Sequence, residues 1–465
     1  MSNQGHKHAL HLGDFDSERF WRDTELARLP GIPDKQAERI VSVMDELLFS
    51  ACDRYACAGP NSQARDDVLI TRRPMQAAHK EYLWEIGFRF RNNEKPVIAP
   101  QSHLYHEAVC ALLPEHAEES YFSSLLADSA WAAFYSVLPT TQRLCEHFAI
   151  PSTIPNVDAV IRANSKCYSH RLAADLLGER YGVLAHSARG LETQGRRLLA
   201  TTPFLVKDAF GVSGKGNVSI DSPRLLERIT RYLIEQENKG KQTRFLLEPL
   251  LDKVLDFSCQ LYIHPEGAAD IVSVQQMHNA GFAFAAIETA DQAFMEQLEG
   301  SGYLNHMESV AARLYREGYF GPVCVDSMLL EDGGIRAMVE INARESMGFI
   351  NHYVDHFLQQ FGKQGSLEFF SLGLPWDIGF EEVLERMRQT GILFEQNNPE
   401  GVLPLSANTL TINRPDETGD RDAPADTLYK GRLYVSIVAS DMARRLDLKQ
   451  RLQAVFRKLG IRDYH

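Results

Sequence analysis

Several kinds of pattern are missing from this chain of 465 residues. Its seven cysteines are scattered and include no CxxC pair, so the sequence predicts reduced thiols rather than a disulfide framework. No run approaches the roughly 18 apolar residues that cross a bilayer, and the N-terminus has no apolar core of signal-peptide length. We therefore expect a cytoplasmic protein, with His6, His8 and His11 in a polar, partly disordered terminus rather than a metal site.

Basic residues are also fewer than acidic residues. The chain has 49 lysines and arginines against 62 aspartates and glutamates, a formal net charge of −13. Because such a chain repels nucleic acid and anionic membranes, we expect neither as a partner. The hydrophobic content of 44% is that of an ordinary globular protein with a sizeable core. At roughly 100–200 residues per domain, the length predicts about three domains or one large composite.

The order of apolar runs predicts an α/β chain. Residues 1–64 are expected to form a helical extension, because Ile40, Met44 and Leu47 recur at helical spacing. Short strands alternate with helices over residues 65–155, which favours an α/β unit with a mostly parallel sheet. Residues 376–465 are expected to form a C-terminal segment that packs on the core.

A lysine and a glycine-rich loop follow one predicted strand. The strand ends at Lys207, and the loop holds Gly211, Ser213, Gly214 and Gly216. Glycines let the backbone approach a phosphate and turn its N–H groups toward it. The segment fits neither GxxxxGK[ST] nor a GxGxxG that opens a helix. On its own it predicts either a phosphate loop or a flexible hairpin loop.

Two predicted strands joined by a glycine-rich turn carry oxygen ligands. The turn places Asp326 opposite or next to Glu340, and Glu340, Asn342 and Arg344 alternate and so project from one face. Two carboxylates and an amide oxygen beside a basic residue form a site that a hard cation such as magnesium prefers. The alternative is a solvated hairpin face. We favour the cation site, because the neighbouring positions are apolar and an unpaired acid among them is costly.

A third segment is an apolar strand that runs into Glu248 and Pro249. Because proline ends regular ladder pairing, backbone groups there are left to contact a planar base. Those contacts would rest on the Glu248 carbonyl and the Leu250 N–H, with Asp256 placed to accept from ribose hydroxyls. The plainer interpretation is a strand end with surface acids.

The three segments occur in one order, and in that order they resemble the ATP-grasp superfamily. In that family a lysine and a glycine-rich loop in a mobile lid cover the phosphates, a Glu-x-x-hydrophobic hinge reads the adenine, and strands ending in E-x-N hold magnesium. An earlier lysine at the start of a helix matches Lys166. The resemblance covers residues 95–375. Two departures are Asp326, where many members have Glu, and Pro249, which removes one donor from the hinge.

The resemblance implies a fold of the α/β (α+β) class with an N-terminal α/β domain before the ATP-grasp domains. The expected divisions are 65–155 for that domain, 156–250 for the lid and its flanking helices, and 251–375 for the central ATP and metal domain. It also implies that ATP is held by Lys166, Lys207, Gly211, Ser213, Gly214, Gly216, Glu248, Leu250 and Asp256. Magnesium, or manganese as an alternative, would bind Asp326, Glu340 and Asn342, with Arg344 and Lys207 as catalytic residues.

The resemblance implies an ATP-dependent ligase. A carboxylate attacks the γ-phosphorus to give an acyl phosphate, and an amine then displaces phosphate to form an amide. Two alternatives stay open: a phosphotransferase that acts on a small metabolite, and a non-catalytic nucleotide-binding protein. The expected partners are a small carboxylate and a small amine, with an amino acid or short peptide as the guess; a homo-oligomer is compatible with the sequence.

Overall fold

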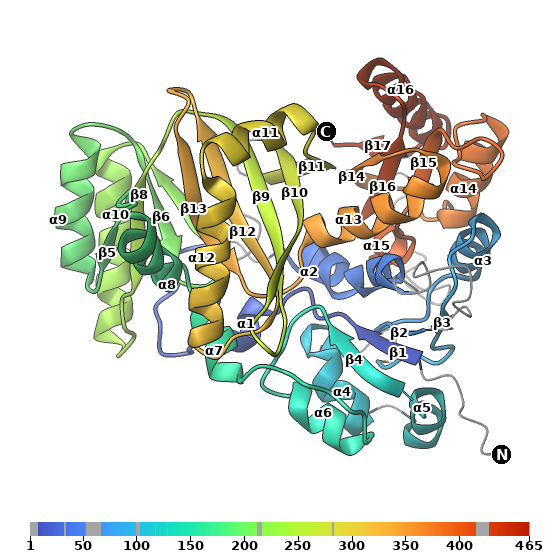
Figure 1. Cartoon of the computed structure of the whole chain (residues 1–465), viewed down its shortest axis with the longest axis horizontal. Coiled ribbons are helices and arrows are strands. Elements are labelled where there is room, and N and C mark those ends of the chain that lie inside the picture. The colour runs from blue at the N-terminus through green and yellow to red at the C-terminus, as the bar shows by residue number, and fades with distance from the viewer. Residues whose placement is uncertain are drawn as a thin grey trace.

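Three β-sheets organise the chain (Figure 1). The structure is a computed structural model that describes residues 8–31, 34–52, 67–98, 103–116, 118–127, 129–211, 216–280, 283–414 and 427–464. A four-stranded sheet belongs to an N-terminal α/β unit, a second four-stranded sheet forms what we call the lid unit, and a nine-stranded sheet runs through the central and C-terminal parts.

The N-terminal sheet has the order β3-β2-β1-β4, and its pairings are parallel. Its strands are β1 (His8–Leu12), β2 (Val68–Ile70), β3 (Arg91–Asn92) and β4 (Ser129–Phe134). The accompanying helices are η2 (His103–His106), α3 (Ala77–Ile86), α4 (Val109–His116), α5 (Glu119–Leu126) and α6 (Thr141–His147). All three residues of β2 are fully buried, as expected of a parallel strand covered on both faces.

The prediction that residues 1–64 form a helical extension is wrong at its start. Strand β1 pairs with both β2 and β4, so it lies inside the N-terminal sheet. His8 and His11 are buried in this strand, and His11 Nε2 lies 3.3 Å from Asp67 Oδ2. Their expected place in a polar, disordered terminus is therefore also wrong, while His6 lies outside the described residues. Helical structure follows as α1 (Glu18–Trp21), α2 (Lys35–Ser42) and the 3-10 helix η1 (Met44–Ala51).

The lid unit is an antiparallel sheet of order β5-β8-β6-β7 packed against two helices. Its elements are β5 (Val183–Ala185), α9 (Ala188–Leu199), β6 (Phe204–Asp208), β7 (Asn217–Ile220), α10 (Pro223–Asn238) and β8 (Phe245–Pro249). Leu191 and Leu226 of the helices share a core with Phe204 of the sheet. Before the lid come α7 (Val157–Ala163), α8 (Lys166–Leu172) and the π-helix η3 (Ala173–Leu177).

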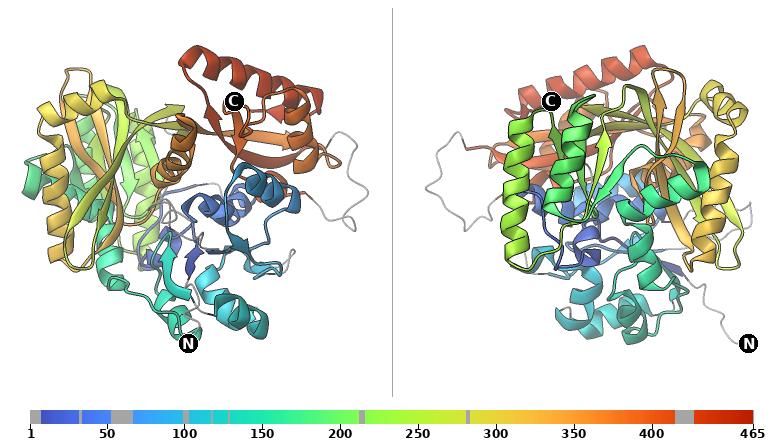
Figure 2. Two further views of the ribbon diagram at one scale, coloured as in Figure 1. Left: turned by 45° about the vertical axis from the view of Figure 1, so that its right-hand side comes forward. Right: turned by 90° about the vertical axis from the view of Figure 1, so that its left-hand side faces the viewer.

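The nine-stranded sheet has the order β13-β12-β9-β10-β11-β14-β16-β15, and β17 pairs with β14. Its first strands are β9 (Lys253–Ile263), β10 (Ala269–Ala280), β11 (Ala283–Thr289), β12 (Gly321–Leu330) and β13 (Ile335–Asn342). It continues with β14 (Gly365–Leu374), β15 (Gly401–Pro404), β16 (Tyr429–Val438) and β17 (Arg462–Asp463). The C-terminal segment therefore extends the sheet that carries the predicted metal ligands (Figure 2).

Helices cover this sheet on both faces. They are α11 (Gln292–Gly300), α12 (Tyr303–Arg316), α13 (Met347–Leu358), η4 (Gln359–Phe361), α14 (Phe380–Gln389), α15 (Asn408–Thr411) and α16 (Met442–Lys458). Cys259 and Leu261 of β9 share a core with Val310 of α12. Because side chains alternate along a strand, Ser258 and Gln260 face the opposite side, which carries the site described below.

Six cysteines are described, and each is a buried free thiol; Cys57 lies outside the described residues. Within the described ranges, no helix is long and apolar enough to cross a membrane.

Candidate active site

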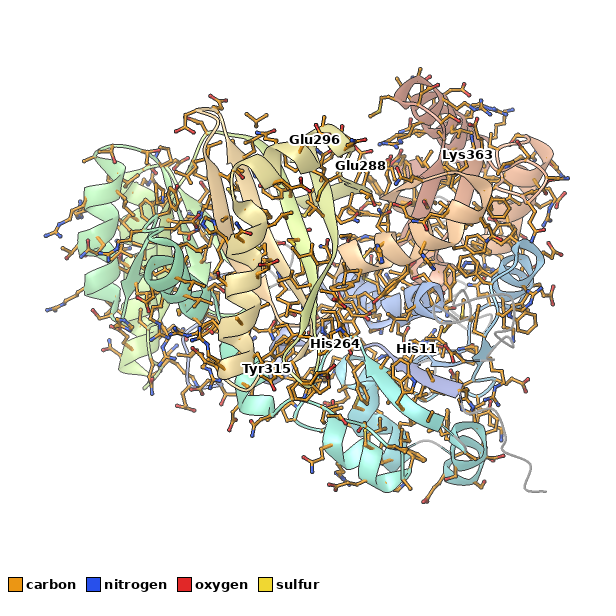
Figure 3. The ribbon with its side chains drawn as sticks, viewed as in Figure 1. His11, His264, Glu288, Glu296, Tyr315 and Lys363 are labelled. Carbon is orange, nitrogen blue, oxygen red and sulfur yellow. The ribbon has the colours of Figure 1, made fainter. Side chains whose placement is uncertain are left out.

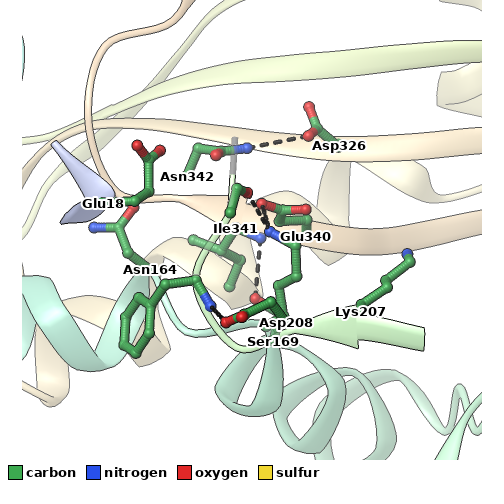
Figure 4. A network of polar contacts seen from close by, with 12 residues as sticks. Glu18, Asn164, Ser169, Lys207, Asp208, Asp326, Glu340, Ile341 and Asn342 are labelled. Carbon is green, nitrogen blue, oxygen red and sulfur yellow. Dashed lines mark hydrogen bonds and ion pairs between the residues drawn. The ribbon is translucent and has the colours of Figure 1, made fainter. Parts of the chain in front are cut away.

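The hairpin of β12 and β13 brings the predicted magnesium ligands together. Asp326 and Glu340 are directly paired across the antiparallel ladder, so their side chains project from one face of the sheet. Asn342 donates a hydrogen bond from Nδ2 to Asp326 Oδ2 at 3.1 Å (Figure 4). The predicted placement of Asp326 opposite Glu340 is confirmed. The carboxylates lie at the edge of the nine-stranded sheet, because β13 is its outermost strand.

Charge around the two carboxylates is unevenly distributed. Lys166, at the start of α8, donates to Glu340 Oε1 at 2.5 Å and to the Gly211 carbonyl at 2.7 Å. The protein atoms around Asp326, and then the charge of Glu340, raise the pKa of Asp326 despite the opposing effect of nearby cations. Two carboxylates and an amide oxygen are donors that magnesium or manganese takes, so the chemistry of this donor set fits a divalent cation; in this structure the Asn342 amide oxygen accepts from Arg344.

Arg344 lies two positions beyond Asn342 and is held from several directions. Its Nη2 donates to Asn342 Oδ1 at 3.0 Å and to Glu18 Oε1 at 3.1 Å. Its Nη1 donates to the Tyr135 hydroxyl at 3.2 Å and to the Glu345 carbonyl at 2.8 Å. The guanidinium is therefore fixed beside the predicted metal ligands by four hydrogen-bond acceptors.

Lys207, predicted to contact phosphate, is paired with the predicted hinge residue. Its Nζ lies 2.5 Å from Glu248 Oε2, and Arg336 of β13 donates to the other carboxylate oxygen. Burial alone would raise the pKa of Glu248, but the charges of Lys207 and Arg336 lower it to about 2. All three side chains are buried, so they form a closed charge cluster between the lid unit and the central sheet.

The prediction that the Leu250 N–H reads a base is wrong for this conformation. That N–H donates to the Pro203 carbonyl at 2.9 Å. The physical reason is that Pro249 does not end the pairing of β8: it lies opposite Phe204 in register, and the contact with β6 continues past the proline. Asp256, predicted to accept from a ribose, is buried on β9 and is contacted by Lys253.

The glycine-rich loop is described at its two ends, whereas Ser213 and Gly214 lie outside the described residues. Gly216 has a φ of +87°, which favours glycine, and its carbonyl accepts from the Asp208 N–H at 3.0 Å. The Gly211 carbonyl accepts from Lys166, so both ends of the loop are bonded at its base.

Two site residues come from the N-terminal segment and were missed by the sequence analysis. Glu18 of α1 holds Arg344, and Arg22 forms an ion pair with Asp208 at the end of β6 (Figure 4 labels Glu18 and Asp208). Arg22 also donates to the Ala27 carbonyl at 2.6 Å. No local pattern marks these residues, because Glu18 and Arg344 are 326 positions apart.

No protein-family model matches the chain, and no curated protein matches its sequence. Solved structures do match. N5-carboxyaminoimidazole synthase from Aspergillus clavatus, in complex with ADP and 5-aminoimidazole ribonucleotide, has a TM-score of 0.50 and 10% identity, covering 97% of this chain and 98% of that chain. Rhizobium etli pyruvate carboxylase has a TM-score of 0.50 and 12% identity, covering 98% of this chain and 37% of that chain.

At such low identity these likenesses concern the fold. They extend over nearly the whole chain, so the expected restriction of the resemblance to residues 95–375 is wrong. The parallel N-terminal sheet, the antiparallel lid unit and the central sheet with paired acids occur here in the order that the resemblance implied. The chain therefore has the ATP-grasp fold.

Proposed function

We propose that the chain is an ATP-dependent ligase that joins a carboxylate to an amine and releases ADP and phosphate. The observation that carries the proposal is the direct pairing of Asp326 with Glu340, with Asn342, Arg344 and Lys166 bonded around them. An oxygen-rich pair of acids flanked by two fixed cations suits a magnesium nucleotide better than a neutral ligand.

In this proposal ATP lies between the lid unit and the central sheet. Lys166 and Lys207 would offset phosphate charge. Since the Leu250 N–H is already bonded to Pro203, the N–H of Leu251 becomes the base donor, in agreement with a Glu-x-x-hydrophobic spacing from Glu248.

Asp326, Glu340 and Asn342 would hold the divalent cation, which when bound neutralises charge on the transferring phosphate. Arg344 supplies a second, fixed positive charge beside it. Because Glu18 and Tyr135 already orient the guanidinium, little reorganisation is needed when charge develops in the transition state.

The proposed reaction has two displacements. An oxygen of the substrate carboxylate attacks the γ-phosphorus in line, and the bond to the bridging oxygen breaks to release ADP. The amine nitrogen then attacks the carbonyl carbon of the acyl phosphate, and phosphate leaves with the bonding electrons while the amine loses a proton. Closure of the lid unit would keep water from the acyl phosphate.

The proposal is tested by incubating the full chain with ATP, magnesium and pairs of small carboxylates and amines, with detection of ADP and of product mass. Magnesium-dependent ADP release together with an amide product supports it. ADP with a phosphorylated metabolite and no amide would replace it with a phosphotransferase, and nucleotide binding without turnover for every pair would leave only a nucleotide-binding protein.

A further inference from the structure

A cavity of about 580 Å³ opens beyond the metal ligands, between the central sheet, α13 and the N-terminal unit. The sheet contributes Tyr262, His264 and Asp270, whereas α13 contributes His352 and His356. Figure 3 labels His264, which lies where the central sheet approaches the N-terminal unit. A cavity of this volume is in the range that holds small organic ligands.

The cavity lies on the same face of the sheet as the metal ligands. Ser258 of β9 is paired with Asp326, and side chains two and four positions further along a strand share its face. Tyr262 is four positions beyond Ser258, which is about 13 Å at roughly 3.3 Å per residue. Gln260 lies between these two positions of β9 and is fully buried under Gly348 of α13, so this distance along the strand is measured through packed side chains.

A hydrogen bond joins the wall of the cavity to the segment that holds Arg344. Tyr353 lines the cavity, and its hydroxyl donates to Glu345 Oε1 at 2.9 Å. Glu345 directly follows Arg344 and accepts the Arg344 guanidinium on its carbonyl. The wall of the cavity and the segment that positions Arg344 are therefore linked by one hydrogen bond between buried side chains.

Aromatic rings form much of the apolar wall. Phe88 from the N-terminal unit stacks on Phe357 of α13, with ring centroids 4.0 Å apart. Phe349 and Tyr353 lie on the same helix, and both line the cavity. Flat rings of this kind suit an aromatic or branched apolar group.

The charged groups of the lining favour an anion. Arg89 carries a permanent positive charge and donates from Nη1 to the Trp84 and Phe88 carbonyls, while His264, His352 and His356 add imidazole nitrogens to the lining. Among the described lining residues Asp270 is the only carboxylate, and it is bonded to His264 Nε2 at 2.8 Å. The described lining thus offers an anion more nitrogen donors than it has carboxylates.

We propose that this cavity binds the end of the substrate that is distal to the reacting group, and that this end carries an aromatic or branched apolar body with a carboxylate. The claim that the reacting group of the substrate points toward Asp326 and Glu340 rests on the proposed function. The claim that the cavity binds the other end does not rest on it, because this binding needs neither ATP nor magnesium and is measured without them.

The probe is 3-phenylpropionate, titrated into the full chain by isothermal calorimetry in the absence of nucleotide. Matched probes are propionate, which lacks the ring, 3-phenylpropan-1-ol, which lacks the charge, and phenethylamine, whose charge is reversed. We expect 3-phenylpropionate to bind at least tenfold more tightly than each of the others. Equal or tighter binding of phenethylamine or of the alcohol overturns the proposal.

Two variants locate the binding. Val272→Phe fills the cavity from a half-buried lining position, and His356→Gln removes one potential cation while keeping a polar side chain. Each is expected to weaken 3-phenylpropionate binding at least tenfold, whereas His306→Gln, at an exposed site on α12 outside the lining, leaves it unchanged. Unchanged binding in both cavity variants, with melting transitions like that of the parent, overturns the proposal.

Failure of this proposal is separable from failure of the ligase. The variant Glu340→Gln is expected to bind 3-phenylpropionate as the parent does while losing magnesium-dependent ADP release. Binding in the cavity with no ADP release for any substrate pair would overturn the ligase and support the cavity assignment. Ligase activity with no selectivity among the four probes would overturn the cavity assignment alone.

Discussion

Two carboxylates on opposite sides of the candidate nucleotide site have opposite electrostatic surroundings. Glu248 lies between Lys207 and Arg336, whose charges overcome the cost of burial and lower its pKa to about 2. Asp326 is surrounded by protein and faces Glu340, and both effects raise its pKa. The charge of Glu248 is balanced by two bonded cations within the chain. The charges of Arg344 and Lys166 offset the raised pKa of Asp326 only in part, and this difference is what the proposed cation site rests on.

The two sites also differ in what they connect. The partners of Glu248 come from the lid sheet and from β13, so this cluster joins the lid unit to the central sheet. Asp326 and Glu340 belong to neighbouring strands of one hairpin. A change at Glu248 should therefore act on stability, and a change at the acid pair should act on turnover.

The largest effect is expected from Glu340→Gln. Loss of one carboxylate from the pair weakens cation binding, so magnesium-dependent ADP release should fall by more than about a hundredfold. Glu331→Gln is the matched control, since Glu331 is exposed in the turn of the same hairpin. ADP release within about threefold of the parent would contradict the metal assignment.

Glu248→Gln is expected to destabilise the fold. Removing the charge leaves Lys207 and Arg336 buried without their carboxylate, at a cost of about 3–5 kcal/mol in the free energy of unfolding. Urea unfolding measures it. Glu227→Gln, at an exposed ion pair with Arg196, should leave the urea midpoint close to that of the parent, because water screens this pair. An equal loss of stability in the two variants would show that the buried Glu248 cluster contributes no more to folding than an exposed ion pair.

Glu18→Gln tests how strongly the orientation of Arg344 depends on its buried carboxylate partner. The Arg344 guanidinium would lose its hydrogen bond to the Glu18 carboxylate and would become less well oriented. We therefore expect kcat to fall by about tenfold, with a smaller change in the KM for ATP. Glu18→Asp should restore part of the rate. The control is Glu25→Gln, which changes an exposed acid in the same segment. A rise in KM alone would show that Glu18 serves binding rather than orientation.

The smallest effect concerns pH. Above pH about 4 the unfolded chain releases the Asp326 proton, while the folded chain, with its raised pKa, retains it. Folding stability therefore falls as pH rises toward the folded-state pKa, and Asp326→Asn removes this contribution. The stability of the variant relative to the parent should therefore increase steadily as pH rises from 4 toward neutrality. Urea unfolding without magnesium tests this, and a constant difference across that range contradicts it.

Local periodicity made part of the site predictable. Alternation along one strand placed Glu340 and Asn342 on one face, and the turn signal placed Asp326 opposite Glu340. These inferences span fewer than about twenty residues, and the ladder of a hairpin fixes them.

The remainder depends on contacts that no local pattern encodes. The hydrogen bond from Arg344 to Glu18 joins α1 to the segment that follows β13. Strand β1 was missed because its sequence contains two histidines, and only its position between β2 and β4 explains why they are buried. The prediction for Leu250 failed because pairing with β6 continues past Pro249.

The continuity of the nine-stranded sheet has a consequence for dissecting the protein. Strands β14 and β16 are paired along ten residues each, and β11 pairs with β14 on the other side. A chain shortened to residues 1–375 would expose the whole backbone edge of β14 that β16 now covers, and such an edge recruits strands from other molecules. The C-terminal segment is thus part of the same sheet as the predicted site, and shortened chains should aggregate.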